Sequence, residues 1–199
     1  MTGDGKDVID DYLTDMLALE EHIGKAVKGQ LRDLKDYPDV IAALRPTHTT
    51  IEHHISDLRM VADRRSAGRA AGSVKPAGAA AVGAAVGLSD LVRGQGLPKN
   101  LRDDHTAFNL ANIGYVMLRT TALALGDHGV ADLAHQHFRD YAGAALRLDR
   151  VIPAAVVRYL QEEGLPAQDV AHQVGRSVEE AWEQKVETGA GEPIPAKRP

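Results

Sequence analysis

The sequence predicts an all-α protein, a four-helix bundle with a long crossover connection between its second and third helices. Apolar residues recur every three or four positions through most of the chain, which is the spacing of one helix face. No stretch alternates β-branched and polar residues, as a half-buried strand would. Residues 66–100, rich in Ala and Gly, separate two pairs of long helical segments. Two helix pairs joined by one long connection form a bundle with a single crossover.

The first helix is predicted to run from Ile9 to Leu34, and Glu20 interrupts its apolar face. The face is formed by Ile9, Leu13, Met16, Ile23, Val27, Leu31 and Leu34. A buried carboxylate without a partner costs several kcal/mol. We therefore expect Glu20 to meet a cation, a metal ion or a hydrogen-bond donor.

The second helix follows the DYPD sequence, because Pro38 suits the first turn of a helix. Pro46 is expected to kink this helix. Its apolar line continues through Ile51, Ile55, Leu58 and Ala62, with His48 on the same line and His54 beside it. Residues 66–100 are predicted to form the crossover, with one short helix in the AGAAAVGAAVGLSDLV stretch.

The third helix is predicted over residues 102–125, with Gly126 ending it. The fourth runs from Val130 to Ile152, where Pro153 marks a kink or a boundary. Their core faces carry Phe108, Tyr115, Leu118, Ala122 and Leu125 on the third helix and Ala134, His137, Tyr141, Ala145 and Leu148 on the fourth.

The C-terminal part is predicted to be an amphipathic fifth helix over residues 167–186. Its apolar edge, which includes Trp182, should dock on the bundle or on a second chain. The chain then divides into a ferritin-like helical bundle over residues 1–164, a C-terminal helix over 165–188 and a flexible tail over 189–199.

Composition limits the chemistry and the location of the protein. The chain of 199 residues has no cysteine, so any metal would be held by imidazole and carboxylate, a set that suits iron, manganese or zinc. A net charge of -5 without a basic patch argues against nucleic-acid binding. No stretch reaches the roughly 18 to 20 apolar residues of a membrane span. The N-terminus lacks the pattern of a signal peptide, so we expect a cytoplasmic protein.

Polar residues on the predicted core faces are the candidate metal ligands. Bundles of this kind build metal sites from inward-facing carboxylates and histidines, and the candidates here are Glu20, His54, His137 and Asp140. The motifs of serine hydrolases, phosphate-binding loops, zinc proteases and dinucleotide-binding folds are absent.

Two stretches carry a family resemblance, DYLTDMLALEEHIGKAV and NIGYVMLRTTALALGDHGVADLA. Both are similar to the bacterial stress-associated ferritin-like family of the Yci type, over roughly residues 7–150. The resemblance implies a ferritin-like bundle in which Glu20 occupies the place of a metal-binding glutamate. His54 and Asp140 also stay in register with ligands of that family.

Other family ligands are missing from this chain. Where the family has a Glu-His pair and a further Glu, the third helix carries Phe108, Asn109, Leu110 and Ala111, and Tyr141 stands where a paired glutamate is expected. A dinuclear site needs about six side-chain ligands. The resemblance therefore implies an eroded metal site, and we expect no resident cofactor, in a stress-associated structural or interaction protein whose role is non-catalytic. We also expect the protein to self-associate through helical faces.

Three alternatives stay open. The first is an iron or manganese oxidase built on the four candidate ligands. The second is a hemerythrin-like oxygen- or metal-binding bundle, since His22, His48 with Glu52, and His135 with Asp140 match its spacings, although Asn109 replaces the histidine expected after His105. The third alternative is a small-molecule pocket in the bundle core, lined by the apolar helix predicted over residues 102–125.

Overall fold

The structure, a computed structural model, describes residues 5–67 and 96–183. The described residues form the helices α1 (Gly5–Asp33), α2 (Pro38–Ala67), α4 (Gly96–Ala124), α5 (His128–Glu162) and α6 (Ala171–Glu183). No strand occurs among these residues, so the all-α prediction is confirmed. The short crossover helix predicted between α2 and α4 and the predicted tail fall outside the described residues.

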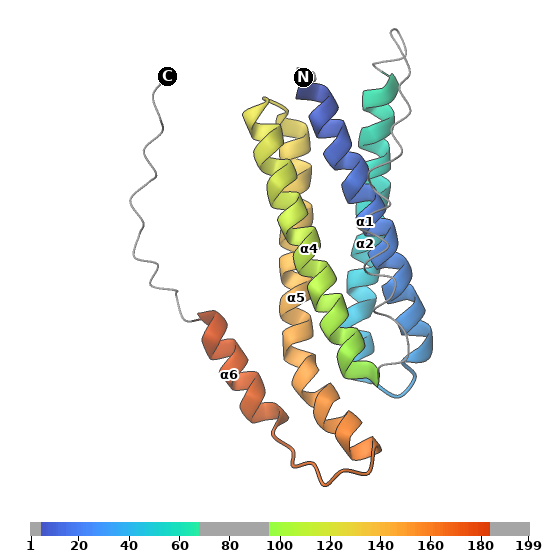
Figure 1. The fold of residues 1–199 in the computed structure, drawn as a ribbon, viewed down its shortest axis with the longest axis vertical. Coiled ribbons are helices and arrows are strands. Elements are labelled where there is room, and N and C mark those ends of the chain that lie inside the picture. The colour runs from blue at the N-terminus through green and yellow to red at the C-terminus, as the bar shows by residue number, and fades with distance from the viewer. Residues whose placement is uncertain (1–4, 68–95, 184–199) are drawn as a thin grey trace.

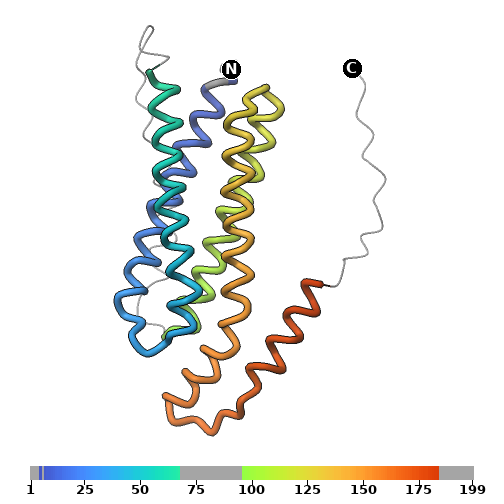
Figure 2. Tube along the Cα trace, turned by 180° about the vertical axis from the view of Figure 1, so that it is seen from behind, coloured from blue at the N-terminus to red at the C-terminus, as the bar shows by residue number. Residues whose placement is uncertain are grey.

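The four long helices pack as two antiparallel hairpins, α1 with α2 and α4 with α5 (Figure 1). α1 also packs against α4, and α2 against α5, which closes the bundle. α2 ends and α4 begins at opposite ends of the bundle, so these two helices run in the same direction (Figures 1 and 2). This is the ferritin-like connectivity that the sequence predicts.

Several helix boundaries differ from the sequence-based prediction, among them the start of α6 at Ala171, four residues later than predicted, and the two largest differences involve proline. α4 begins at Gly96, six residues earlier than predicted, with Pro98 in its first turn, where the missing N–H would have no intrahelical partner in any case. α5 continues through Pro153 as far as Glu162. Its N-terminus is capped by Asp127, whose side chain accepts a hydrogen bond from the Val130 N–H.

The core runs along the bundle axis and consists mainly of aliphatic side chains with a few rings. Its largest fully buried members include Leu13, Ile23, Leu44, Ile51, Leu58, Leu101, Phe108, Leu118 and Leu148.

Gly114 allows α4 to approach α1, because a Cβ at this position would lie 2.5 Å from the Met16 sulfur. At one end, Arg65 of α2 pairs with both Asp10 of α1 and Asp127. None of the described helices has the length and apolar character needed to cross a bilayer.

The C-terminal helix α6 lies outside the four-helix core and contacts α5 (Figure 2). The Trp182 indole N–H donates to Asp149 Oδ2 at 3.0 Å, yet its side chain remains 63% exposed. No residue of α6 is buried. α6 therefore docks on the bundle, but its apolar edge, including Trp182, is not buried within one chain. α5 ends close to the predicted bundle boundary at residue 164, and the division into domains stays a prediction.

Candidate functional site: a buried glutamate and its partners

Glu20 lies at the middle of α1 and is fully buried. The Tyr115 hydroxyl of α4 donates to Glu20 Oε1 at 2.5 Å, and the Tyr141 hydroxyl of α5 donates to Oε2 at 2.6 Å. His54 of α2 adds a third contact, with Nδ1 3.0 Å from Oε1. All four bundle helices thus meet at one carboxylate. The expectation that Glu20 finds hydrogen-bond donors is confirmed.

His54 connects this buried carboxylate to a partly exposed one. Its second ring nitrogen, Nε2, lies 3.2 Å from Oδ2 of Asp140, whose side chain is 41% exposed. Burial lowers the pKa of His54, but the hydrogen bonds and charges of Glu20 and Asp140 outweigh burial and raise it above its ordinary value. An imidazolium that donates from both nitrogens satisfies this geometry, and its charge neutralises one of the two carboxylates.

His137 is fully buried and stacks on His54, with ring centroids 3.7 Å apart. Its Nδ1 lies 3.0 Å from the Tyr115 hydroxyl oxygen. Since that hydroxyl donates its hydrogen to Glu20, His137 must donate from Nδ1. Burial, and then the charge of His54, lower the pKa of His137 to about 3, so this ring is neutral.

The other nitrogen of His137, Nε2, is buried and has no hydrogen-bond partner among the described residues. The nearest carboxylate oxygen is Oδ2 of Asp57 at 3.6 Å, too far for a hydrogen bond. With Nδ1 protonated, Nε2 carries a free lone pair. His137 is therefore the one ring of the cluster with a nitrogen available to an added ligand or proton.

The two tyrosines act as neutral donors. Burial, followed by the negative charge of Glu20 and the hydrogen bond to it, raises the pKa of Tyr115 and Tyr141 well above the ordinary value of 10. Both rings also pack in the core, 6.2 Å apart between centroids. The sequence places both tyrosines on core faces but does not identify them as part of the site. The available signal is that a buried tyrosine hydroxyl usually needs a partner.

A single metal ion, but not a dinuclear centre, matches the donor atoms of this cluster. Glu20, His54 and His137 each offer a ligand atom, and these atoms lie within 4.8 Å of one another. Phe108 and Ala111, which the sequence resemblance aligns with metal-ligand positions, are fully buried and have no side-chain lone pair to offer. The residues present therefore do not fit the roughly six-ligand dinuclear site of ferritin-like proteins.

The remaining histidines of the sequence analysis do not join this cluster. Of the three histidines in the HTTIEHH stretch only His54 is buried, whereas His53 is exposed and His48 pairs with Glu52 one turn along the same helix at 3.8 Å. His135 contacts Arg119 at 2.8 Å, and His105 contacts Asp149 at 3.0 Å. The hemerythrin-like ligand set, which needs Glu52 and His135 in the core, is not assembled among the described residues.

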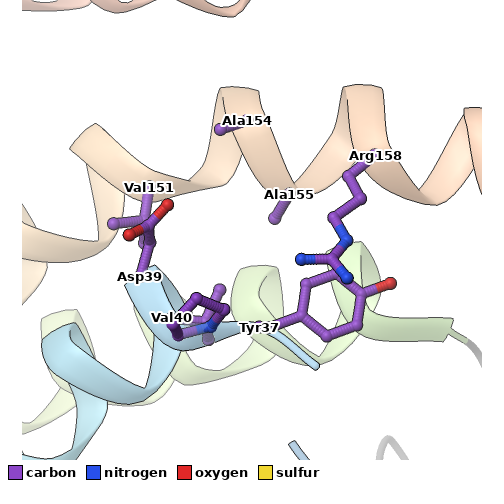
Figure 3. A pocket seen from close by; sticks show the side chains of 8 residues that line it. Tyr37, Asp39, Val40, Val151, Ala154, Ala155 and Arg158 are labelled. Carbon is purple, nitrogen blue, oxygen red and sulfur yellow. The ribbon is translucent and has the colours of Figure 1, made fainter. Parts of the chain in front are cut away.

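Two crevices of the described structure lie away from the buried cluster. The larger, about 270 Å³, is an apolar space between α5 and α6 lined by Ile152, Pro153, Val156, Val157, Val170, Val174 and Val178 among others. The smaller, about 50 Å³, lies where α2 begins beside α5, with the Arg158 guanidinium over the Tyr37 ring (Figure 3). No residue of α4 lines either crevice, so neither supports the predicted small-molecule pocket beside the third helix.

Solved structures share this architecture at low sequence identity. A protein from Xanthomonas campestris pv. campestris has a TM-score of 0.64 at 17% identity, covering 82% of this chain and 100% of that one. The E. coli stress protein YciF has the same TM-score at 16% identity, covering 78% of this chain and 98% of its own. No family model and no curated protein sequence matches the chain. These likenesses confirm the Yci-type, ferritin-like fold that the sequence resemblance predicts.

Proposed function

We propose that the protein is a non-catalytic, stress-associated helical bundle whose centre is closed by hydrogen bonds in place of a dinuclear metal site. The observation that carries this proposal is the saturation of Glu20. Both of its carboxylate oxygens accept short hydrogen bonds from tyrosine hydroxyls, and His54 supplies the compensating positive charge. A buried carboxylate with these partners does not require a metal ion.

The association with stress is supported only by the fold shared with the E. coli protein, which is named as a stress protein. We also propose a cytoplasmic protein that self-associates through helical faces. Support for self-association comes from large apolar side chains that stay exposed on α4, namely Leu110, Ile113, Val116, Met117 and Leu123. A second set of exposed apolar side chains lies on α6 and the residue before it, namely Val170, Val174 and Trp182. Contiguous exposed apolar surface is uncommon on monomers.

A second candidate function is the binding of one iron or manganese ion. The clustering of Glu20, His54 and His137, with the free lone pair on His137 Nε2, favours it. Two imidazoles and a carboxylate suit such ions. To bind one, His54 would have to lose one of its ring protons and its hydrogen bond to Glu20. The affinity for the metal ion would therefore decrease as the pH is lowered.

Metal analysis of protein purified without a histidine tag or chelator separates the two candidates. We expect well under one iron or manganese per chain, including after expression in medium rich in both metals. Two tightly bound ions per chain, lost in a Glu20→Ala variant, would overturn the proposal. One ion per chain, lost in both Glu20→Ala and His137→Ala but kept in Glu21→Ala, would favour the second candidate instead.

A further inference from the structure

A second buried polar cluster lies between α1 and the early turns of α4. Asn100, Asp103 and Asp104 are spaced so that they share one face of α4. Gln30 reaches this face from α1, and its side-chain Nε2 donates to Asp104 Oδ1 at 2.8 Å. Gln30 follows Glu20 by ten residues, which corresponds to ~15 Å along a helix. This cluster is therefore separate from the Glu20 site.

The cluster contains four buried oxygens that accept no hydrogen bond from the described residues. They are Gln30 Oε1, Asn100 Oδ1, Asp103 Oδ2 and Asp104 Oδ2. Asp104 is only 4% exposed and Gln30 only 8%, so bulk water does not reach them freely. Leaving one buried acceptor unsatisfied costs about 1–3 kcal/mol. Four such oxygens, three on one face of α4 and one on the Gln30 side chain bonded to that face, require a common explanation.

No side chain or backbone group among the described residues donates a hydrogen bond to these oxygens. Arg102 donates to Oδ1 of Asp103 at 2.6 and 2.8 Å but leaves Oδ2 without a partner. Asp104 forms no ion pair within the described part of the chain. Burial, and the nearby charge of Asp103, raise the pKa of Asp104 to about 7, although the bond from Gln30 lowers it. A missing positive charge is the simplest common cause of the unsatisfied oxygens and of the raised pKa of Asp104.

We propose that Gln30, Asn100, Asp103 and Asp104 form a binding site for a hard divalent cation of the calcium or magnesium type. All the available atoms are oxygens, two from carboxylates and two from amide carbonyls, which is the donor set that these ions prefer. Gln30 is an independent indication, because it comes from another helix, is only 8% exposed, and keeps its side-chain oxygen without a partner at the acidic face that its amide N–H contacts. The cluster begins at the fifth residue of α4, beyond the turn where the helix dipole opposes a cation.

Calorimetric titration of the full chain with Ca²⁺ and with Mg²⁺, after treatment with chelator, tests this site. We expect one site per chain for at least one of the two ions, and a rise in melting temperature that grows with ion concentration. Asp104→Asn keeps the shape of the side chain but removes its charge, and should weaken binding at least about tenfold. Asp33→Asn removes an exposed carboxylate from the same end of α1 and should leave binding unchanged.

Further variants keep the test decisive. If Asp104→Asn does not fold, Asp103→Asn should show the same loss of binding, since Asp103 is partly exposed and its replacement disturbs the core less. Glu20→Gln should retain binding, and loss of binding there would move the ion to the central cluster and overturn the proposal. Absence of binding and of thermal stabilisation at about 10 mM of either ion, above the range of weak protein calcium sites, would equally overturn it.

Discussion

The imidazole rings of His54 and His137 stack with 3.7 Å between their centroids and 19° between their planes. Two positive charges at this separation in a buried site would repel strongly. The surroundings assign the charge to one ring, because His54 faces two carboxylates whereas His137 contacts a tyrosine hydroxyl. The stack therefore consists of one imidazolium and one neutral imidazole.

We predict that the two rings titrate on opposite sides of the ordinary histidine pKa of 6.5. His54 should stay protonated above that pH, and His137 should stay neutral down to a pH of about 3. Nuclear magnetic resonance of the ring carbons across a pH series measures both, with His54→Gln and His137→Gln used to assign the signals. Two titrations that both centre near 6.5 would contradict this charge assignment.

The stability of the bundle should depend on pH through the same pair. The folded pKa of His137 is lowered, so the unfolded chain binds a proton below pH 6.5 that the folded chain does not, and stability falls as the pH drops toward about 3. The folded pKa of His54 is raised, so its contribution is present below 6.5 and is lost as the pH rises through that folded pKa. Urea unfolding over a pH series measures this dependence. The free energy of unfolding should fall less at acid pH in His137→Gln, and less at alkaline pH in His54→Gln, than in the unmodified protein.

Replacing Glu20 with leucine should destabilise the fold. The change leaves the hydroxyls of Tyr115 and Tyr141 and the charge on His54 without their common acceptor, which we expect to cost about 2–4 kcal/mol. Urea unfolding at neutral pH measures the loss. Glu21→Leu is the matched control, because Glu21 is exposed and its ion pair with Arg59 is exposed as well. Equal stability of the two variants would mean that the buried hydrogen bonds contribute nothing.

Tyr115→Phe and Tyr141→Phe should each lower the free energy of unfolding by about 1–2 kcal/mol, because each removes a donor from a buried carboxylate. Tyr115→Phe should be the more harmful, since it also removes the acceptor of His137. The double variant should depart from additivity, as members of one network do. Tyr12→Phe serves as a control from the edge of the same core, and its stability should be close to that of the unmodified protein.

Trp182 fluorescence should report self-association. At low protein concentration its 63% exposed side chain should emit like a solvated indole, and emission should shift to the blue as concentration rises and a second chain covers the apolar edge. A chain truncated after Gly164 should lose part of this association but keep its melting temperature, because no residue of α6 is buried. Emission that does not change with concentration would argue against an interface at α6.

The periodicity of apolar residues is sufficient to predict the helices, but it does not predict the hydrogen bonds within the site. Glu20 stands out in an otherwise apolar line, and His54 and Asp140 could be placed near it from the resemblance and helix register. Tyr115 and Tyr141 could not, because a tyrosine on a core face has the same periodic signature as a phenylalanine. Their roles depend on which atoms meet across four helices far apart in sequence.

The sequence does not predict the cluster around Asp104 or the exposure of the apolar edge of α6, because both depend on how distant segments pack. Asn100, Asp103 and Asp104 read as ordinary polar positions near a helix start. Only the structure shows that a side-chain oxygen of each is buried and that Gln30 packs against Asp104. For α6, the amphipathic pattern correctly indicates an apolar edge. It cannot say whether that edge is covered by the same chain or left exposed.

The convergence of four helices on the Glu20 carboxylate also bears on how the chain selects one packing arrangement. Aliphatic layers are permissive, and a helix displaced along its neighbours by one turn, about 5.4 Å, would still bury leucine and alanine. The same displacement would separate Glu20 from at least one of the tyrosine or histidine donors that reach it. Misaligned bundles would therefore carry a buried charge without all of its hydrogen-bond partners. The hydrogen bonds at the centre thus favour the native alignment of the helices over alignments shifted by one turn.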